Sequence, residues 1–262
     1  MLWFIGLGLN SEKDISLRGL EIARKCKEIY MENYTSVMAS FSLENLRELV
    51  SKDVVVIGRE EMESSSFRRE IIEKSANMDI GILVPGEPMA ATTHQIFRIE
   101  ALESGINVGI VHSSSIFSAA PSLLGLHHYK FGRTTSIPKI RNNYLPLSPY
   151  EVIEENLQRG LHTLILLDTQ PPITANEGLN ILLEMESKAK KGVIDENTLV
   201  CVVGNAGSFE PVLRCDALGN LIKEDFGPVP HSIVIPGKLH FTEAEALVKI
   251  CKCPRELVED FL

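Results

Sequence analysis

The chain has 262 residues, of which 44% are hydrophobic and 23% charged, a mix typical of a globular protein with one large or two smaller domains. Its formal net charge of −9 argues against a body that binds nucleic acid. No apolar run approaches the roughly 20 residues that span a bilayer, and the N-terminus lacks the basic segment and cleavage site of a secretory signal.

The N-terminal half alternates between apolar runs and segments with helical spacing. We predict strands at 2–5, 28–31, 54–57, 80–84 and 107–111, and helices at 15–26, 43–50, 59–76 and 93–104. The β-branched run at 54–57 predicts a buried strand. Gly105 directly follows the helix expected at 93–104 and is placed to end it. This alternation predicts βαβ units and a mostly parallel sheet.

Loops of unusual composition follow three of these strands. Gly6-Leu7-Gly8-Leu9 begins like a dinucleotide-binding turn, although Ser11 stands where a third glycine would fall. The stretch 84–94, VPGEPMAATTH, stops a buried strand with Pro and Gly and continues with small residues that leave room for a ligand. The alternative is an ordinary strand-to-helix loop.

The third loop, HSSSIFSAA at 112–120, is rich in hydroxyl side chains. Such residues usually cap the helix that follows them. The same hydroxyls and backbone amides can also hold a carboxylate or a ribose.

The second half predicts another α/β sheet, joined to the first through residues 111–115. Residues 130–146 are expected to be extended or loop. Helices are expected at 148–159, at 174–190 and after residue 242, opened by capping boxes at Ser148, Thr174 and Thr242. Strands are expected at 163–167, 199–203, 212–215 and 232–235, some of them antiparallel because the connections are short.

The five cysteines form no CxxC pair. Cys251 and Cys253 are spaced like half of a metal site, but no second half accompanies them in the sequence. We therefore expect reduced thiols, no metal and a cytoplasmic protein.

Five loops are expected to converge on one cleft, since each follows a predicted strand: 6–9, 85–91, 113–116, 167–172 and 204–208. The sequence has no Walker A, HExxH or GxSxG motif, and its seven histidines are scattered. A site that binds by backbone and shape suits methyl transfer from a sulfonium, because such a cofactor brings its own leaving group.

Many segments resemble the diphthine synthase branch of the tetrapyrrole methylase superfamily. They cover nearly the whole chain: FIGLGL at 4–9, YTS at 34–36, VPGEPMAATTH at 84–94, HSSSIFSA at 112–119, GLHHYKFG at 125–132, GLHTLILLD at 160–168, TANE at 174–177, EDFG at 224–227 and PGKLHFTEAE at 236–245. The resemblance implies two α/β domains, residues 1–112 and 113–262, with S-adenosyl-L-methionine in the cleft between them, and a homodimer.

The family's cofactor contacts carry over to eight positions of this chain: Leu9, Glu87, Ala90, Ser115, Ile116, Leu167, Ala206 and His231. The family usually has Asp where this chain has Glu87, and a larger apolar residue at Ala90. No residue identifies itself as the catalytic base, and no metal ligand is implied.

The resemblance also implies the reaction. It is trimethylation of the amino group of a 3-amino-3-carboxypropyl-histidine on translation elongation factor 2, which gives diphthine in diphthamide biosynthesis. A methyltransferase acting on a tetrapyrrole carbon is one alternative, although its many-carboxylate acceptor calls for a basic site. A non-catalytic nucleotide-binding adaptor is another, although the intact glycine turns argue against decay. Neither nucleic acid nor membrane is expected as a partner.

Overall fold

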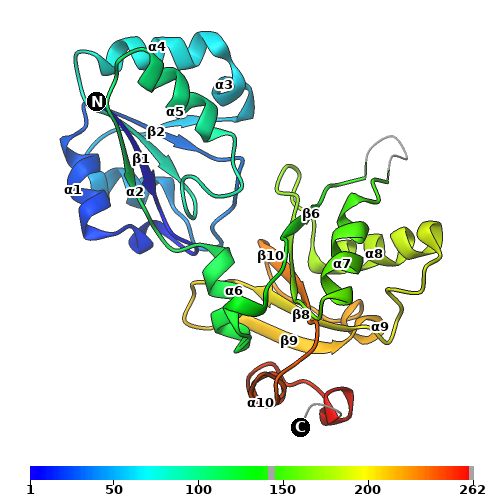
Figure 1. Cartoon of the computed structure of the whole chain (residues 1–262). Helices are drawn as coiled ribbons and strands as arrows, with labels where there is room; N and C mark the ends of the chain where they lie inside the picture. The colour runs from blue at the N-terminus through cyan, green and yellow to red at the C-terminus, as the bar shows by residue number, and fades with distance from the viewer. Residues whose placement is uncertain (141–144, 260–262) are drawn as a thin grey trace. The chain divides into compact units, whose positions relative to one another are not determined.

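The computed structural model describes residues 1–140 and 145–259, and the chain divides into two compact units (Figure 1). Unit 1 is Met1–Ile116 and unit 2 is Phe117–Leu262. The domain boundary expected between residues 112 and 113 stays a prediction. The loop expected at 130–146 lies partly outside the described residues, at 141–144.

Unit 1 contains a parallel sheet in the order β3-β2-β4-β1-β5. Its strands are β1 (Leu2–Gly6), β2 (Glu28–Glu32), β3 (Val55–Ile57), β4 (Ile80–Val84) and β5 (Val108–Val111). The parallel arrangement that the alternating pattern predicted is therefore confirmed. Because β4, β1 and β5 are neighbours, the loops that follow them leave the same edge of the sheet.

Helices cover both faces of this sheet, as Figure 1 shows. Phe4 and Ile82 pack with Phe97 beneath α4 and α5, whereas Ile5 packs with Leu46 on the side of α1 and α2. This follows from the alternation of side chains along a strand. The helices are α1 (Leu17–Lys25), α2 (Leu43–Val50), α3 (Arg59–Glu63), α4 (Ser65–Ser75) and α5 (His94–Glu103), with a 3-10 turn at Glu12–Asp14.

Two expectations for unit 1 were wrong. The single helix expected at 59–76 is broken at Ser64, whose Oγ accepts a hydrogen bond from the Phe67 N–H (3.4 Å) and so caps α4. The strand expected to be buried at 54–57 is the edge strand β3, and Val55 and Val56 are 50% and 41% exposed. A β-branched run identifies a strand but not its place in the sheet.

Unit 2 contains a mixed sheet in the order β6-β7-β10-β8-β9. β6 (Thr135–Ile137) is parallel to β7 (Thr163–Leu167), whereas β10 (His231–Ile235) is antiparallel to β7 and β8, and β8 (Leu199–Gly204) is antiparallel to β9 (Val212–Ala217). The expected mixture of strand directions is confirmed. Strand β6 lies inside the segment that we expected to be extended or loop, and it agrees with the extended alternative.

The main core of unit 2 joins the sheet to α7 and α8, through Ile153, Leu182 and Ile233 among others. The helices are α6 (Ile116–Leu124), α7 (Ser148–Gln158), α8 (Ala175–Ala189), α9 (Leu218–Leu221) and α10 (Phe241–Ile250), with 3-10 turns at His128–Lys130 and Arg255–Leu257. In the described part of the chain we find no helix with the length and apolar character needed to cross a bilayer.

The capping predictions for unit 2 had mixed outcomes. The box at Thr174 is confirmed. Ser148 is not a cap, because Leu147 already has helical dihedrals and is the N-cap of α7, without a side-chain hydrogen bond. The N-cap of α10 is His240 and not Thr242, because the carboxylate that closes this box is that of the buried Glu243, three residues after His240.

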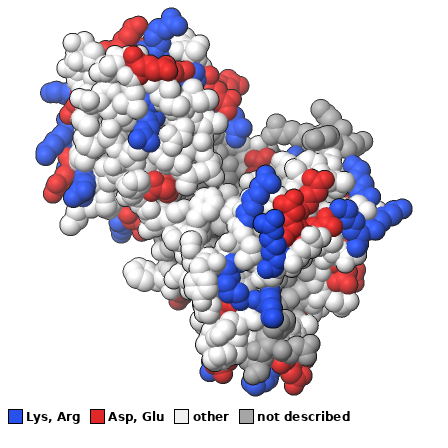
Figure 2. Space-filling model, viewed as in Figure 1, with Lys and Arg blue, Asp and Glu red and all other residues white. Residues whose placement is uncertain are grey.

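Charged side chains of both signs lie beside one another on the face of the two units shown in Figure 2. The ion pairs of unit 2 include Lys191–Glu154 (2.7 Å) and Lys139–Glu177 (3.5 Å). Exposed pairs of this kind contribute little to stability.

Candidate functional site

The loops after β1 and β4 are bound to each other through their backbones. The Gly86 N–H donates to the Gly8 carbonyl (2.7 Å), and the Leu7 N–H donates to the Val84 carbonyl (2.8 Å). A Cβ at Gly6 would lie 2.6 Å from the Gly86 carbonyl oxygen and 2.6 Å from the Ser113 Cβ. Only glycine fits at position 6. The loops that follow β1, β4 and β5 therefore approach one another closely here, without a side chain at Gly6.

Glu87 ties the loop after β4 to the loop after β5. Its Oε1 lies 2.8 Å from Nδ1 of His112, and its Oε2 accepts the Ser113 N–H (3.0 Å). The Glu87 side chain is only 15% exposed. Both carboxylate oxygens therefore have protein partners, which gives Glu87 a role in joining the loops.

The other predicted contacts of unit 1 lie around this junction. Leu9 follows Gly8, and the next residue, Asn10, has a buried side-chain Oδ1 with no hydrogen-bond partner. The Ala90 N–H donates to the Glu87 carbonyl (3.3 Å) within the same loop. Ser115 directly precedes α6 and Ile116 is its first residue, so both lie two or three positions from the amide that Glu87 holds.

In unit 2, the three predicted contacts lie at one edge of the second sheet. Leu167 ends β7, and Ala206 lies two residues after the end of β8. His231 begins β10, which runs antiparallel between these strands and places His231 opposite Gly204. The structure thus brings five of the eight predicted positions together in unit 1 and three together in unit 2.

His231 is buried, and its hydrogen bonds define its tautomer. Nδ1 accepts the Ala175 N–H (3.1 Å) at the start of α8, so the ring proton lies on Nε2. Nε2 is buried and has no hydrogen-bond partner. Burial lowers the pKa of His231, and the backbone around Gly227 partly offsets this effect. The ring is therefore neutral and offers a donor.

Sequence reasoning missed two residues of these edges. His112 pairs with Glu87 across 25 positions of the chain, which no local pattern reveals. Asn205 has a left-handed backbone (φ 52°) and a buried Oδ1 without a hydrogen-bond partner. Its signal was the GNAG sequence, because Asn adopts the left-handed region more readily than most residues.

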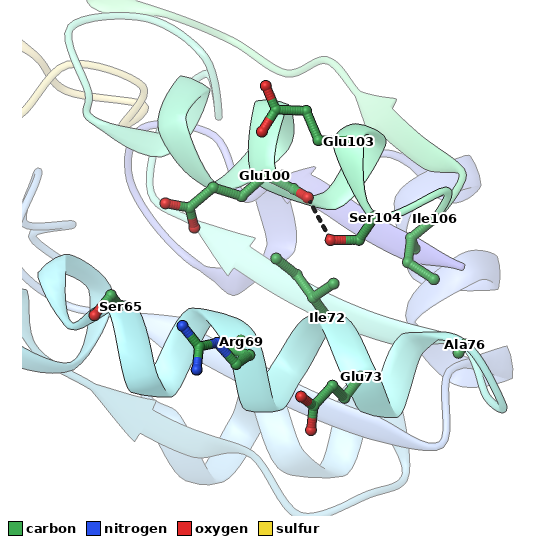
Figure 3. Close-up of a pocket in the computed structure, with 9 residues that line it drawn as sticks. All are labelled: Ser65, Arg69, Ile72, Glu73, Ala76, Glu100, Glu103, Ser104 and Ile106. Atoms are coloured by element: carbon green, nitrogen blue, oxygen red, sulfur yellow. Dashed lines mark hydrogen bonds between the residues drawn. The ribbon is translucent and has the colours of Figure 1, made fainter.

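A groove with a volume of about 730 Å³ lies between α4 and α5, away from these loops (Figure 3). Arg69 and Glu73 line it from α4, and Glu100 and Glu103 line it from α5. One end is formed by Ala76 and Ile106, which precede β4 and β5 and so lie toward the amino edge of the parallel sheet. None of the eight predicted positions lines this groove.

Four of the five cysteines form a cluster in unit 2 that the sequence did not reveal, whereas Cys26 lies in unit 1. Cys201 and Cys215 lie opposite each other on β8 and β9, with their Sγ atoms 2.9 Å apart, and the Cys215 N–H donates to the Cys251 carbonyl (3.1 Å). All five thiols are buried and none is in a disulfide. Within the described residues, no group of three or more His, Cys, Asp or Glu side chains is placed to hold a metal ion.

The structure thus consists of two α/β units, with glycine-containing loops at the carboxyl edge of the first sheet. The family model described as Tetrapyrrole (Corrin/Porphyrin) Methylases matches residues 1–217, and the chain belongs to this family.

Its relatives point to one branch. The chain is 44% identical to the diphthine synthase of Methanothermobacter thermautotrophicus, covering 99% of this chain and 98% of the relative. It is 45% identical to that of Methanocaldococcus jannaschii, covering 96% and 99%. A crystal structure of diphthine synthase superposes with a TM-score of 0.90 at 38% identity, covering 100% of this chain and 99% of the other. A putative diphthine synthase from Entamoeba histolytica gives 0.86 at 32% identity, covering 95% and 98%.

Proposed function

We propose that the chain is an S-adenosyl-L-methionine-dependent methyltransferase that trimethylates the amino group of a 3-amino-3-carboxypropyl-histidine on translation elongation factor 2, giving diphthine. The observation that carries this proposal is identity of 44–45% to diphthine synthases over almost the whole of both chains. Similarity of that extent covers both units and all the loops described above.

The donor set at the two sheet edges fits this cofactor. The cofactor presents an adenine, a ribose and an amino acid carboxylate, all of which form hydrogen bonds. Three of the buried side-chain atoms without a partner lie at these edges, on Asn10, Asn205 and His231. A buried polar group without a partner costs free energy, so its retention favours a ligand that completes the bond.

We propose that the cofactor contacts are Leu9, Glu87, Ala90, Ser115, Ile116, Leu167, Ala206 and His231. When bound, the cofactor supplies a methyl group on a sulfonium. The chain's own task is to orient the acceptor nitrogen and to let it lose a proton, because only the lone pair of an amine is nucleophilic.

We also propose a homodimer that works in the cytoplasm, with elongation factor 2 as its protein partner and neither nucleic acid nor membrane. The five unpaired thiols favour a reducing compartment. Sedimentation of the purified protein tests the dimer directly.

The decisive experiment is mass spectrometry of elongation factor 2 that carries the precursor side chain, after incubation with this protein and the cofactor. We expect a mass increase of three methyl groups on the modified histidine, and none without the cofactor. A parallel incubation with a carboxylated tetrapyrrole tests the nearest alternative. Methylation of the tetrapyrrole, with the elongation factor unchanged, would overturn the proposal.

Calorimetry separates the binding step from the reaction. The cofactor and its demethylated product should bind with the same heat in the presence and absence of a chelator. Binding without turnover on any acceptor would support the adaptor alternative instead.

A further inference from the structure

His112 differs from His94, the second histidine of unit 1, in its combination of a carboxylate partner and exposure. It is the first residue after β5, its side chain is 75% exposed, and its Nδ1 lies 2.8 Å from Glu87 Oε1. An ionised carboxylate can only accept, so Nδ1 carries the proton of this bond. In the neutral ring, the lone pair is then on Nε2, which forms no hydrogen bond with any described residue.

Its position is central to the loops that we propose hold the cofactor. The next residue, Ser113, also donates its N–H to Glu87, and its Cβ lies against Gly6 in the first glycine turn. Ser115 follows two residues later. Glu87 thus fixes both the tautomer and the position of an imidazole whose side chain is largely exposed.

The other histidine of this region is unsuitable for contact with a protein-bound substrate. His94 is 1% exposed, its Nδ1 bonds to the Pro88 carbonyl (2.9 Å), and its ring stacks on Phe4 with 5.8 Å between centroids. A residue in that position cannot reach an acceptor carried by a second protein.

We propose that Nε2 of His112 is the general base of the reaction and that Glu87 is its positioning residue. This inference rests on the proposed function, in which an ammonium group must be deprotonated before each methyl transfer. The N–H bond of the substrate breaks, its proton passes to Nε2, and the electron pair stays on nitrogen. That pair forms the new N–C bond while the C–S bond breaks and its electrons stay on sulfur, and the proton leaves His112 to water.

The test compares His112→Asn with the wild type. Asn keeps an N–H at the position of Nδ1, so it can still donate to Glu87, but it has no basic nitrogen. We expect the rate of a single methyl transfer to fall by about 10²–10⁴-fold, the usual contribution of a positioned base. Added imidazole should restore part of the rate, whereas affinity for the demethylated cofactor, measured by calorimetry, should stay within about twofold.

The matched control is His128→Asn. His128 is an exposed histidine in a 3-10 turn of unit 2, and we expect its variant to react at the wild-type rate. Thermal unfolding of both variants shows whether the fold is intact. A His112→Asn enzyme with the wild-type rate, or one that imidazole does not rescue, would refute the inference.

A second readout does not depend on activity. Long-range ¹H–¹⁵N correlation of the imidazole nitrogens, recorded at a pH at which the ring is neutral, should show the His112 ring proton on Nδ1. In Glu87→Leu the proton should redistribute toward Nε2. A proton on Nε2 in the wild type would overturn the assignment. If the wild type fails to methylate elongation factor 2, the proposed function itself is wrong. The spectrum tests the tautomer of His112 independently of activity, so the two failures can be distinguished.

Discussion

Glu87 and Glu243 are carboxylates held by several donors, and the two pairings have different consequences. Glu87 lies at the edge of a sheet beside a solvent-exposed imidazole. Glu243 is fully buried in unit 2 and bonds to groups from three separate segments of the chain. The first pairing bears on ligand binding, and the second bears on the stability of the fold.

At Glu87 we predict a difference between two substitutions. Glu87→Gln keeps the length but places an amide N–H₂ toward a donor, whereas Glu87→Asp keeps the charge and shortens the side chain by one methylene. A hydrogen bond to a charged group is worth about 1.5–3 kcal/mol, so Gln should weaken cofactor binding about tenfold or more. Asp should cost less. Calorimetry checks both variants, and unchanged affinity in Gln would remove Glu87 from the proposed contacts.

Glu243 should make stability depend on acid pH. Its Oε1 accepts from the His127 N–H (2.7 Å) and lies 3.0 Å from His162 Nε2, and its Oε2 accepts from the His240 N–H and from Lys130. Burial alone raises the pKa of Glu243, but these donors, Lys130 foremost, lower it from 4.5 to about 2. A lowered carboxyl pKa stabilises the fold above the ordinary value, and this contribution disappears as pH falls from 4.5 toward 2.

Urea unfolding of wild type and Glu243→Gln across that pH range measures this contribution. The variant should be less stable near neutral pH by about 3–5 kcal/mol, because it leaves the partly buried ammonium group of Lys130 without its anionic partner. It should also lose less stability on acidification. The slope should not vanish, since the pKa of Glu186 is likewise lowered to about 2. Equal slopes in the two proteins would show that Glu243 titrates normally.

At the scale of elements, two hydroxyl residues that look alike in the sequence should behave differently. Thr174 Oγ1 accepts the Glu177 N–H (3.2 Å) and caps α8, whereas Ser148 lies inside α7 and caps nothing. Thr174→Ala should lower the free energy of unfolding by about 0.5–2 kcal/mol. Ser148→Ala should change it by less than about 0.5 kcal/mol. Urea unfolding of these two variants measures the difference. Equal losses of stability would contradict the assignment of Thr174, and not Ser148, as a helix cap.

At the scale of the whole molecule, the buried thiols provide a measure of how tightly the chain is packed. Burial raises the pKa of Cys26 to about 11 and that of Cys251 to about 12, so neither is a thiolate near neutral pH. We expect a disulfide reagent to react with five thiols after denaturation and with almost none in the native protein over the same minutes. Rapid reaction of a native thiol would show that one of the two units opens locally.

The sequence by itself determined the positions of most helices and strands, and it identified the loops of unusual composition that follow the strands. Helix α2 and strands β4 and β7 have the predicted bounds, because apolar spacing is a local property that survives folding. The Thr174 box was equally readable, since both of its members lie within four residues. The eight proposed contacts came from resemblance, and their contacts with cofactor stay predictions.

The tertiary structure decided what depends on residues far apart in the chain. Strand order put Val55 and Val56 at an exposed edge, and it put Cys201 beside Cys215. It also joined Glu87 to His112, and His162 to Glu243 across 81 positions. Periodicity sets which side of an element is apolar, but only the packing of elements selects the partner of a polar side chain.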